Sequence, residues 1–197
     1  MKILIAEDDG LVANDLARKL HGIGHHVAGM AETGLRAVEA ARTLAPDLIL
    51  LDVAMPGLDG ITAAREILAS RPVPIIMITA HGDPDLVGQA ASAGVMGYLL
   101  KPVSATALRA GIQVALARFV ELQTLARQVS GLTEALEVRK VVERAKGILM
   151  KRLQVSEAEA FRRLQRRAGT ERRSLRDVAQ AVWEADRYFE EIESDRG

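Results

Sequence analysis

Cysteine is absent from this chain of 197 residues, which excludes a disulfide framework and a metal site built from thiolates. No apolar run approaches the roughly 20 residues that a membrane-spanning helix needs, and no basic-then-apolar leader precedes the first apolar segment. A chain of this length can bury a sizeable hydrophobic core, so it needs no disulfides or structural metals to fold. We therefore expect a soluble, cytoplasmic protein of one large or two small domains, with no membrane partner.

Proline is missing after Pro102, and no Gly/Ser/Pro-rich linker interrupts the second part of the chain. Nearly all of this second part has helical periodicity. Apolar residues recur in it at spacings of three and four, as in a coiled-coil seam: Leu122, Leu125, Val129, Leu132 and Leu136. The seam is short and contains Gly131. We expect the last helix of a first domain to continue directly into a helical second segment.

A net charge is also lacking, but the two signs are unevenly distributed. Residues 1–126 carry 10 Lys/Arg and 13 Asp/Glu, whereas residues 127–176 carry 14 Lys/Arg and 6 Asp/Glu. This uneven distribution predicts that the two parts of the chain have different functions, with a polyanion as candidate partner of the basic segment. The alternative is that the basic residues only form a solvated helical surface. Residues 127–197 contain no histidine and no convincing acid–base pair, so we expect no enzymatic output.

The first 103 residues alternate between short apolar runs and segments of helical period. The runs are Ile3–Ala6, His26–Met30, Leu48–Leu51, Ile75–Ile78 and Gly97–Leu100, and the helical segments are Leu11–Leu20, Leu35–Leu44, Ile61–Ala69 and Leu86–Ala93. Runs such as LILL and IIMI are apolar on both faces, which is typical of parallel strands covered by helices on both sides. The pattern predicts an α/β fold with a doubly wound, five-stranded parallel sheet, whose ligand chemistry lies at the carboxyl ends of the strands.

Polar side chains stand at the ends of four of these runs: Glu7, Asp8, Asp9, Asp52, Thr79 and Lys101. Each alone is unremarkable, since an aspartate after a strand is more often a helix cap or a loop residue. Together they should converge, and clustered carboxylates favour a hard cation such as Mg²⁺. A carboxylate beside Mg²⁺ can attack phosphorus, while a hydroxyl and an ammonium group bind the other phosphoryl oxygens.

The stretches ILIAEDD, LILLDVAMPGLDG, IIMITA and GYLLKP resemble the receiver domain of two-component response regulators, from about Met1 to Phe119. The resemblance implies a flavodoxin-like receiver fold, a sensor histidine kinase as partner and Asp52 as phosphoacceptor. It implies that Mg²⁺ is held by Glu7, Asp8, Asp52 and the backbone carbonyl of Ala54.

The same resemblance assigns the phosphoryl group two further partners, Thr79 and Lys101. Tyr98 matches the aromatic position whose ring turns inward when Thr79 shifts, although a half-buried sheet aromatic explains it equally simply. Asp9 is expected beside the metal ligands or as the cap of the first helix.

The run Val141–Val182 resembles the ANTAR domain of AmiR- and NasR-type transcription antiterminators, through AKGILM, SEAEAFRRL and RRSLRDVAQAV. The resemblance implies binding of RNA stem-loops in nascent mRNA, transcription antitermination, and two ANTAR units acting together. We expect a receiver at 1–119, a helical coiled-coil linker at 120–136, a three-helix ANTAR domain at 137–197 and a phosphorylation-dependent homodimer. A DNA-binding response regulator and a protein-interaction adaptor are the alternatives.

Within the basic segment, capping-box patterns predict helix starts at Ser156, with Glu159, and at Ser174, with Asp177. The stretch Gly169–Arg173 is a plausible helix end and turn between them. Apolar residues at helical spacing are expected in the core rather than stacked on bases: Phe161, Leu164, Leu175, Val178, Val182 and Trp183.

The candidate RNA-binding residues are Lys146, Gly147, Lys151, Arg172, Arg173 and Arg176. Lys146 and the three arginines are expected to be exposed, whereas Arg162, Arg163, Arg166 and Arg167 are equally consistent with a solvated face. Gly147 stands inside a helical pattern, where glycine costs roughly 1 kcal/mol relative to alanine. Either RNA or a neighbouring helix can approach a bare helix surface there, and Ala145 is small enough to serve helix packing in the same way.

Overall fold

A computed structural model describes residues 1–80 and 84–194 of the chain, which divides into two compact units, residues 1–124 and 125–197. Each unit has its own hydrophobic core: two clusters pack on the sheet of the first unit, and a third lies among the helices of the second. Within the described residues, no helix combines the length and apolar character required to cross a membrane.

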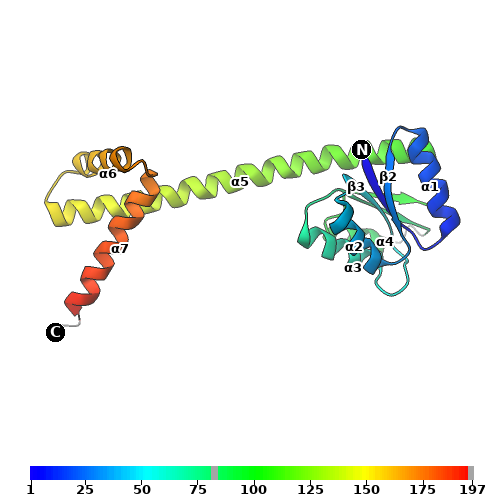
Figure 1. The fold of residues 1–197 in the computed structure, drawn as a ribbon, viewed down its shortest axis with the longest axis horizontal. Helices are drawn as coiled ribbons and strands as arrows, with labels where there is room; N and C mark the ends of the chain where they lie inside the picture. The colour runs from blue at the N-terminus through cyan, green and yellow to red at the C-terminus, as the bar shows by residue number, and fades with distance from the viewer. Residues whose placement is uncertain (81–83, 195–197) are drawn as a thin grey trace. The chain divides into compact units, whose positions relative to one another are not determined.

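The first unit contains, in its described residues, a five-stranded parallel sheet of order β2-β1-β3-β4-β5 (Figure 1). The strands are β1 (Lys2–Ala6), β2 (His26–Ala31), β3 (Leu48–Asp52), β4 (Ile75–Thr79) and β5 (Gly97–Leu100). All five residues of β3 and of β4 are buried, as expected for strands covered on both faces. The predicted doubly wound fold is confirmed, and its topological switch point lies between β1 and β3.

Helices cover both faces of this sheet. They are α1 (Gly10–Gly22), α2 (Gly34–Leu44), α3 (Gly60–Ser70), α4 (Pro84–Ser92) and the first part of α5 (Ala105–Leu153). Leu4, Ile49 and Met77 face the cluster that includes α2 and α3, whereas Ile5 and Leu50 face the cluster that includes α1 and α5. Successive residues of one strand thus serve opposite faces, which is why the apolar runs show no alternation.

The helix α5 spans 49 residues and continues from the first unit into the second without a break, as the missing proline and linker predicted. The predicted seam residues Leu122, Leu125, Val129 and Leu136 are 50 to 63% exposed, and the side chain of Leu132 lies outside the described residues. An apolar stripe therefore runs along an exposed part of this helix.

The second unit adds α6 (Glu157–Glu171) and α7 (Leu175–Ser194) to the end of α5. Both predicted helix starts are confirmed, since the Ser156 hydroxyl accepts from the Glu159 amide at 3.3 Å and the Ser174 hydroxyl accepts from the Asp177 amide at 3.0 Å. The predicted helix end and turn within Gly169–Arg173 are confirmed, since α6 ends at Glu171. Arg172 follows as the C-cap in the left-handed conformation (φ 52°), with the Arg173 amide bonded back to the Ala168 carbonyl.

The core of this second unit contains Leu164 and Val178, both buried, with Phe161, Leu175 and Val182 packed against them. Trp183 is half-buried, and the guanidinium carbon of Arg144 lies 5.4 Å from the centre of its ring. Ala145 is fully buried, so helix packing accounts for its small side chain.

Candidate functional site

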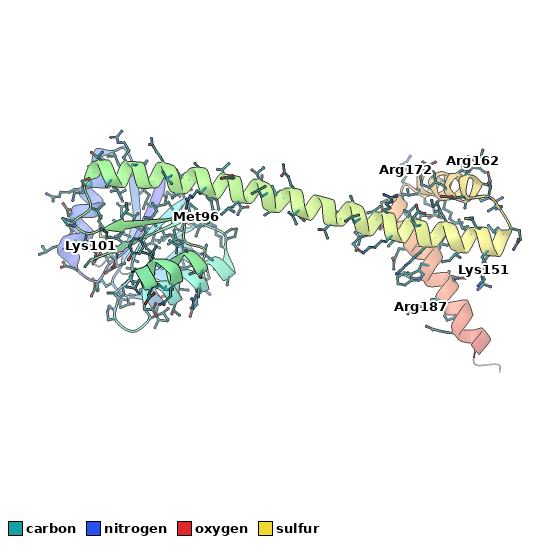
Figure 2. The ribbon with its side chains drawn as sticks, turned by 180° about the vertical axis from the view of Figure 1, so that it is seen from behind. Met96, Lys101, Lys151, Arg162, Arg172 and Arg187 are labelled. Carbon is teal, nitrogen blue, oxygen red and sulfur yellow. The ribbon has the colours of Figure 1, made fainter. Side chains whose placement is uncertain are left out.

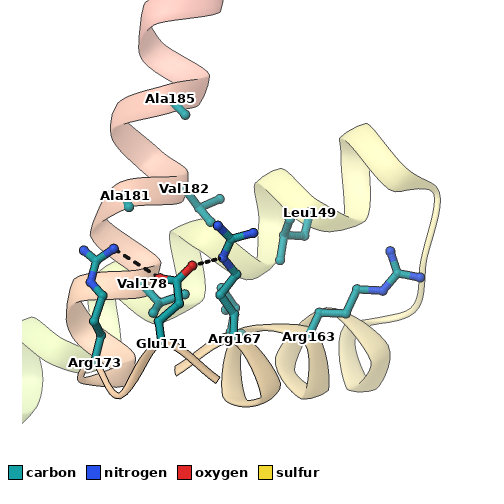
Figure 3. A pocket seen from close by; sticks show the side chains of 10 residues that line it. Leu149, Arg163, Arg167, Glu171, Arg173, Val178, Ala181, Val182 and Ala185 are labelled. Carbon is teal, nitrogen blue, oxygen red and sulfur yellow. Dashed lines mark hydrogen bonds and ion pairs between the residues drawn. The ribbon is translucent and has the colours of Figure 1, made fainter. Parts of the chain in front are cut away.

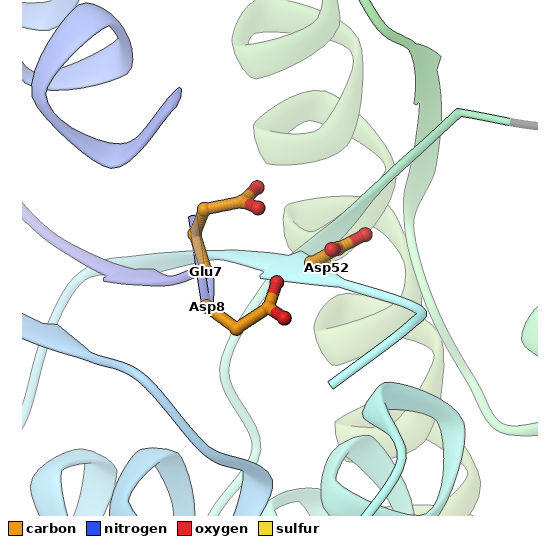
Figure 4. A group of neighbouring side chains, drawn as sticks. All are labelled: Glu7, Asp8 and Asp52. Atoms are coloured by element: carbon orange, nitrogen blue, oxygen red, sulfur yellow. The ribbon is translucent and has the colours of Figure 1, made fainter. Parts of the chain in front are cut away.

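Three carboxylates meet at the carboxyl edge of the sheet, beside the switch point. Glu7 and Asp8 follow β1, and Asp52 is the last residue of β3. Because β1 and β3 are neighbours in register, with Ala6 opposite Leu51, the residues after these two positions lie side by side. One oxygen of each carboxylate lies within 4.8 Å of the others (Figure 4). The predicted convergence of strand ends is confirmed for these residues.

Lys101 enters this cluster from the end of β5. Its Nζ donates to Asp52 Oδ2 at 3.0 Å and to Glu7 Oε1 at 2.8 Å, and lies 2.7 Å from Glu7 Oε2. Glu7 and Asp52 are 3% and 4% exposed, whereas Asp8 is exposed. One ammonium group therefore faces three carboxylates, two of which have been removed from water.

The pKa shifts report this imbalance of charge. Burial raises the pKa of Glu7, the hydrogen bond from Lys101 opposes that effect, and the charge of Asp52 adds to it. For Lys101, burial alone would lower the pKa, but the hydrogen bonds to Glu7 and Asp52 outweigh burial and raise it. The Lys101 ammonium thus stays charged, and the pKa of Glu7 lies above its ordinary value.

The donor set suits a hard divalent cation. Glu7 Oε2 is buried and accepts no hydrogen bond within the described residues, although it is part of the ion pair with Lys101. Asp8 adds an exposed carboxylate on the solvent side, and Ala54 lies in the exposed bend two residues after Asp52. Carboxylate and carbonyl oxygens are the ligands that Mg²⁺ prefers, with water completing its octahedron. These residues therefore fit the ion.

Asp9 has a different task from its two acidic neighbours. Its Oδ1 accepts from the amides of Leu11 at 2.8 Å and Val12 at 3.3 Å, so it is the N-cap of α1. Of the two expectations for Asp9, the cap is confirmed.

Thr79 and Tyr98 flank the cluster from the next two strands. Thr79 ends β4 and is 4% exposed, and its carbonyl accepts from the Lys101 amide at 2.8 Å, which holds the end of β5 against β4. Tyr98 is half-buried in β5 and packs against the core cluster on the α2 and α3 face. A half-buried ring fits both interpretations of Tyr98, and its position does not separate them.

Gly60 is a site residue that the search for polar side chains missed. A Cβ atom on Gly60 would lie 1.9 Å from the carbonyl oxygen of Asp52, so only glycine lets α3 begin against the end of β3. Asp59 caps the same helix by accepting from the Thr62 amide at 2.9 Å. The DG pair after LILLDVAMPGL was visible in the sequence, but a close approach between backbones leaves no side-chain pattern.

In the second unit, the prediction that Lys146 is exposed is wrong. Its side chain is 10% exposed, with Nζ 2.8 Å from Glu143 and 2.6 Å from Glu157, and the ring centre of Phe161 5.9 Å away. The reason is tertiary, because Glu157 is the first residue of α6 and returns to α5 after a turn. Lys146 therefore joins two helices and is not available as a free cation.

Gly147, the next residue, is exposed, and a Cβ atom built there would meet nothing within 4 Å. Packing of a neighbouring helix of this chain therefore does not explain the glycine. Lys151, one turn further along α5, is exposed (Figure 2). The two residues leave an accessible surface with a bare backbone at one end and a cation at the other.

The predicted arginine cluster lies at the turn from α6 to α7. Arg172, Arg173 and Arg176 are all exposed, and Figure 2 shows Arg172 at this turn. Arg173 lies 3.3 Å from Glu171 and donates to the Asp177 carbonyl at 3.3 Å. Of the ambiguous arginines, Arg162 and Arg163 pair with Glu159, at 3.1 and 3.0 Å.

Known proteins share both halves of this arrangement. The response regulator receiver domain family matches residues 3–113, and the ANTAR domain family matches residues 130–182. The transcriptional regulatory protein PdtaR of Mycobacterium tuberculosis is 44% identical over 183 residues, which cover 93% of this chain and 89% of PdtaR. The DNA-binding response regulator MtrA of Mycobacterium leprae is 37% identical over 117 residues, 59% of this chain and 52% of MtrA.

A solved structure, the signal receiver domain of a modulated diguanylate cyclase from Desulfovibrio desulfuricans G20, superimposes with a TM-score of 0.57 at 35% identity. It covers 62% of this chain, and 97% of that domain is matched. The likeness to PdtaR, in contrast, extends through both units. The chain therefore belongs to the response regulators that combine a receiver domain with an ANTAR domain, and it is related to PdtaR over most of its length.

Proposed function

We propose that this response regulator accepts a phosphoryl group on Asp52 from a sensor histidine kinase and, through its ANTAR domain, binds RNA stem-loops in nascent mRNA and causes antitermination. The observation that carries the first step is the buried Asp52 carboxylate, 3.0 Å from Lys101 and grouped with Glu7 and Asp8. The family of the chain and the basic surface of the second unit support the second step.

In the transfer, an Asp52 oxygen attacks phosphorus, the P–N bond to the kinase histidine breaks, and the imidazole nitrogen leaves with the electron pair of that bond. Mg²⁺, held by Glu7, Asp8, Asp52 and the Ala54 carbonyl, would neutralise charge on the transferring group. The hydroxyl of Thr79 donates to a phosphoryl oxygen, and Lys101 exchanges part of its pairing with Asp52 for another. Tyr98 follows the shift of Thr79.

The domain limits that we propose are 1–119 for the receiver, 120–136 for a helical linker and 137–197 for the ANTAR domain. The division into compact units between residues 124 and 125 supports a linker in this region. The exposed stripe formed by Leu122, Leu125, Val129 and Leu136 supports self-association of two chains through this linker.

RNA is favoured over DNA because the likeness to MtrA, a DNA-binding regulator, spans only 117 residues, about the length of the receiver, whereas the likeness to PdtaR continues through the ANTAR domain. Lys151, Arg172, Arg173 and Arg176 would contact phosphates, and the bare surface at Gly147 would let the RNA backbone come close. Loop bases are accessible to such a surface, whereas the major groove of duplex RNA is not.

The test is selection of RNAs that carry two adjacent hairpins, from a pool with randomised loops, at about 150 mM salt, with Mg²⁺ and with or without a small phosphodonor. Wild type treated with the phosphodonor should bind selected hairpins at least tenfold more tightly than Asp52→Ala, and excess duplex DNA should not compete. Equal binding by Asp52→Ala would remove phosphorylation from the mechanism. Competition by duplex DNA would favour a DNA-binding regulator, and no hairpin binding in any state would refute the RNA function.

A further inference from the structure

A pocket of about 280 Å³ lies in the second unit, between the end of α5, α6 and the middle of α7. Its apolar wall comes from all three helices: Leu149, Leu164, Val178, Ala181, Val182 and Ala185. Leu164 and Val178 belong to the hydrophobic core, so the pocket reaches down to buried core side chains. Apolar walls of this kind favour a flat, uncharged group, because burial in the pocket removes its apolar surface from water.

The mouth of the pocket is cationic. Arg163, Arg167 and Arg173 line it, against the one carboxylate of Glu171 among its lining residues. Glu171 lies between two of these guanidinium groups, 2.6 Å from Arg167 and 3.3 Å from Arg173 (Figure 3). The same carboxylate therefore contacts both cations at the rim, which shows that an oxyanion can bind between them, while Arg163 pairs with Glu159.

We propose that this pocket seats a single unpaired base of an RNA loop, with the base against the apolar wall and its phosphate on Arg167 and Arg173. The inference rests on the proposed RNA function and adds to it the residues that read the loop. Of the residues singled out from the sequence, the predicted core positions Leu164, Val178 and Val182 line the pocket wall. Of the six RNA-binding candidates, Arg173 alone reaches the rim.

Size and charge favour a nucleotide over a protein segment. The volume is below the range of about 300–1,000 Å³ typical of pockets for drug-sized ligands, which suits one planar base. A docked helix would need an apolar groove with room for several side chains, and an apolar helix face would offer no anion to a rim that carries three arginines and one glutamate. If the base occupies the pocket, the phosphate of the same nucleotide supplies an anion for the guanidinium groups at the rim.

The first variant fills the pocket without changing charge. Ala181→Phe places a ring where the base would lie, and Ala185→Phe does the same from an exposed position if the first variant folds poorly. Ala158→Phe is the matched control, because Ala158 is exposed on α6 and lies outside the pocket lining. The probe is a hairpin RNA selected on the wild-type protein, together with copies in which one loop base at a time is replaced by an abasic site.

For wild type and for Ala158→Phe, one abasic position should weaken binding about tenfold, as expected for the loss of one stacked base. The filled variants should bind the intact hairpin about tenfold more weakly and should be insensitive to that same abasic position. If both changes instead weaken binding independently, the base lies elsewhere and the pocket inference is wrong while RNA binding stands. If no protein binds any hairpin, the proposed function itself fails.

A second measurement tests the rim. Arg167→Gln should weaken hairpin binding and reduce the slope of log affinity against log salt by about one, since one phosphate contact is lost. Glu171→Gln should strengthen binding, because it frees both guanidinium groups. The control Arg187→Gln removes an exposed charge of α7 that is paired with Glu191 at 3.3 Å, and should leave the slope unchanged. A change in self-association of the filled variants, with RNA binding intact, would point to a protein occupant and overturn the proposal.

Discussion

The adjacent residues Asp8 and Asp9 have different surroundings. Asp8 is exposed and belongs to the carboxylate cluster, whereas Asp9 caps α1. The two aspartates differ because α1 begins directly after Asp9, which places only Asp9 at the N-cap position. The charge of the cluster, two buried carboxylates and one exposed carboxylate against Lys101, sets the demand for a cation.

The first prediction uses this pair. Asp8→Asn should weaken Mg²⁺ binding about tenfold or more, because one of three anionic ligands becomes neutral. Asp9→Asn removes the same charge but keeps a capping oxygen, so it should leave Mg²⁺ affinity nearly unchanged. Titration calorimetry with MgCl₂ measures both. For wild type, Mg²⁺ at about 100 times its dissociation constant should add about 2.7 kcal/mol to the free energy of unfolding of the receiver. Equal losses in the two variants would contradict the assignment of Asp8.

The second prediction concerns His25, which lies between α1 and β2. Burial lowers its pKa below the ordinary value of 6.5, and the positive charges of the N-terminal amine and Arg109 act in the same direction. Its Nδ1 is buried without a hydrogen-bond partner among the described residues. Because the unfolded chain then binds more protons than the folded chain, the stability from neutral His25 is complete above about pH 6.5 and is lost as pH falls toward the folded pKa.

Urea unfolding at several pH values between about 7.5 and 5.5 measures this effect. His25→Gln should flatten the acid-side loss of stability, whereas His21→Gln, at an exposed position on α1, should retain it. Glu7 acts in the opposite direction, since its raised pKa makes the folded state gain stability as pH falls through that value. The comparison of variants at each pH therefore isolates the histidine. An unchanged slope in His25→Gln would show that the ring is not desolvated in solution.

At this scale, the sequence predicted the carboxylate cluster and Lys101 but failed at Lys146. Strand ends in a parallel sheet converge by topology, so the strand pattern alone is enough to place together residues that are distant in sequence. The environment of Lys146 depends on how α6 returns to α5, which brings Glu157 and Phe161 to the side chain. The helical periodicity of the sequence does not show how α6 packs against α5, so it favoured an exposed Lys146.

At the scale of elements, α5 and α6 show what helical periodicity predicts and what it does not. The absence of proline and of a linker predicted that the last helix of the first domain continues directly into a helical second segment, and α5 is a single helix of 49 residues. The end of α6 lies within the predicted stretch Gly169–Arg173, and the residue in the left-handed position is Arg172. Gly169 lies inside the helix, so the composition of the stretch indicated the turn but not the residue that ends the helix.

The third prediction compares two glycines of α5, Gly131 and Gly147. Both are exposed, and at neither would a Cβ atom meet anything within 4 Å. Replacing either by alanine should raise the free energy of unfolding by up to about 1 kcal/mol, because alanine is the better helix former. If RNA approaches the bare surface at Gly147, Gly147→Ala should also weaken hairpin binding severalfold, while Gly131→Ala should not.

Thermal unfolding and hairpin binding, measured on the same preparations, separate the two effects. A gain in stability together with weaker RNA binding at Gly147 alone supports a contact surface there. Unchanged affinity in Gly147→Ala, with the expected gain in stability, would place the RNA elsewhere and leave the glycine without an explanation in this chain.

At the scale of the whole molecule, a receiver and a helical output unit share one helix, and a stripe of exposed apolar side chains lies on that helix. Exposed leucines and valines at heptad spacing lower their free energy by pairing with a second copy. One aspartyl phosphate can affect RNA binding only if it favours a state that binds RNA better, and the proposed dimer with two ANTAR units would be such a state.

The last prediction tests this state. Leu125→Asn combined with Val129→Asn should raise the dimer dissociation constant at least tenfold in the presence of a small phosphodonor, since polar groups interrupt the seam. Val120→Asn is the matched control, because Val120 is 63% exposed on α5 but lies about 140–200° around the helix from Leu125 and Leu122. Sedimentation velocity should show dimers for wild type and Val120→Asn, and monomers for the double variant and for Asp52→Ala.

RNA binding then reports whether the dimer matters for output. For an RNA with two adjacent hairpins, binding of the first ANTAR unit places the second at high effective concentration, so the dimer gains affinity that a monomer cannot. The double variant should therefore lose this gain on paired hairpins and bind a single hairpin as wild type does. If it keeps full affinity for the paired RNA while monomeric, one ANTAR unit is sufficient, and the role of phosphorylation must lie within a single chain.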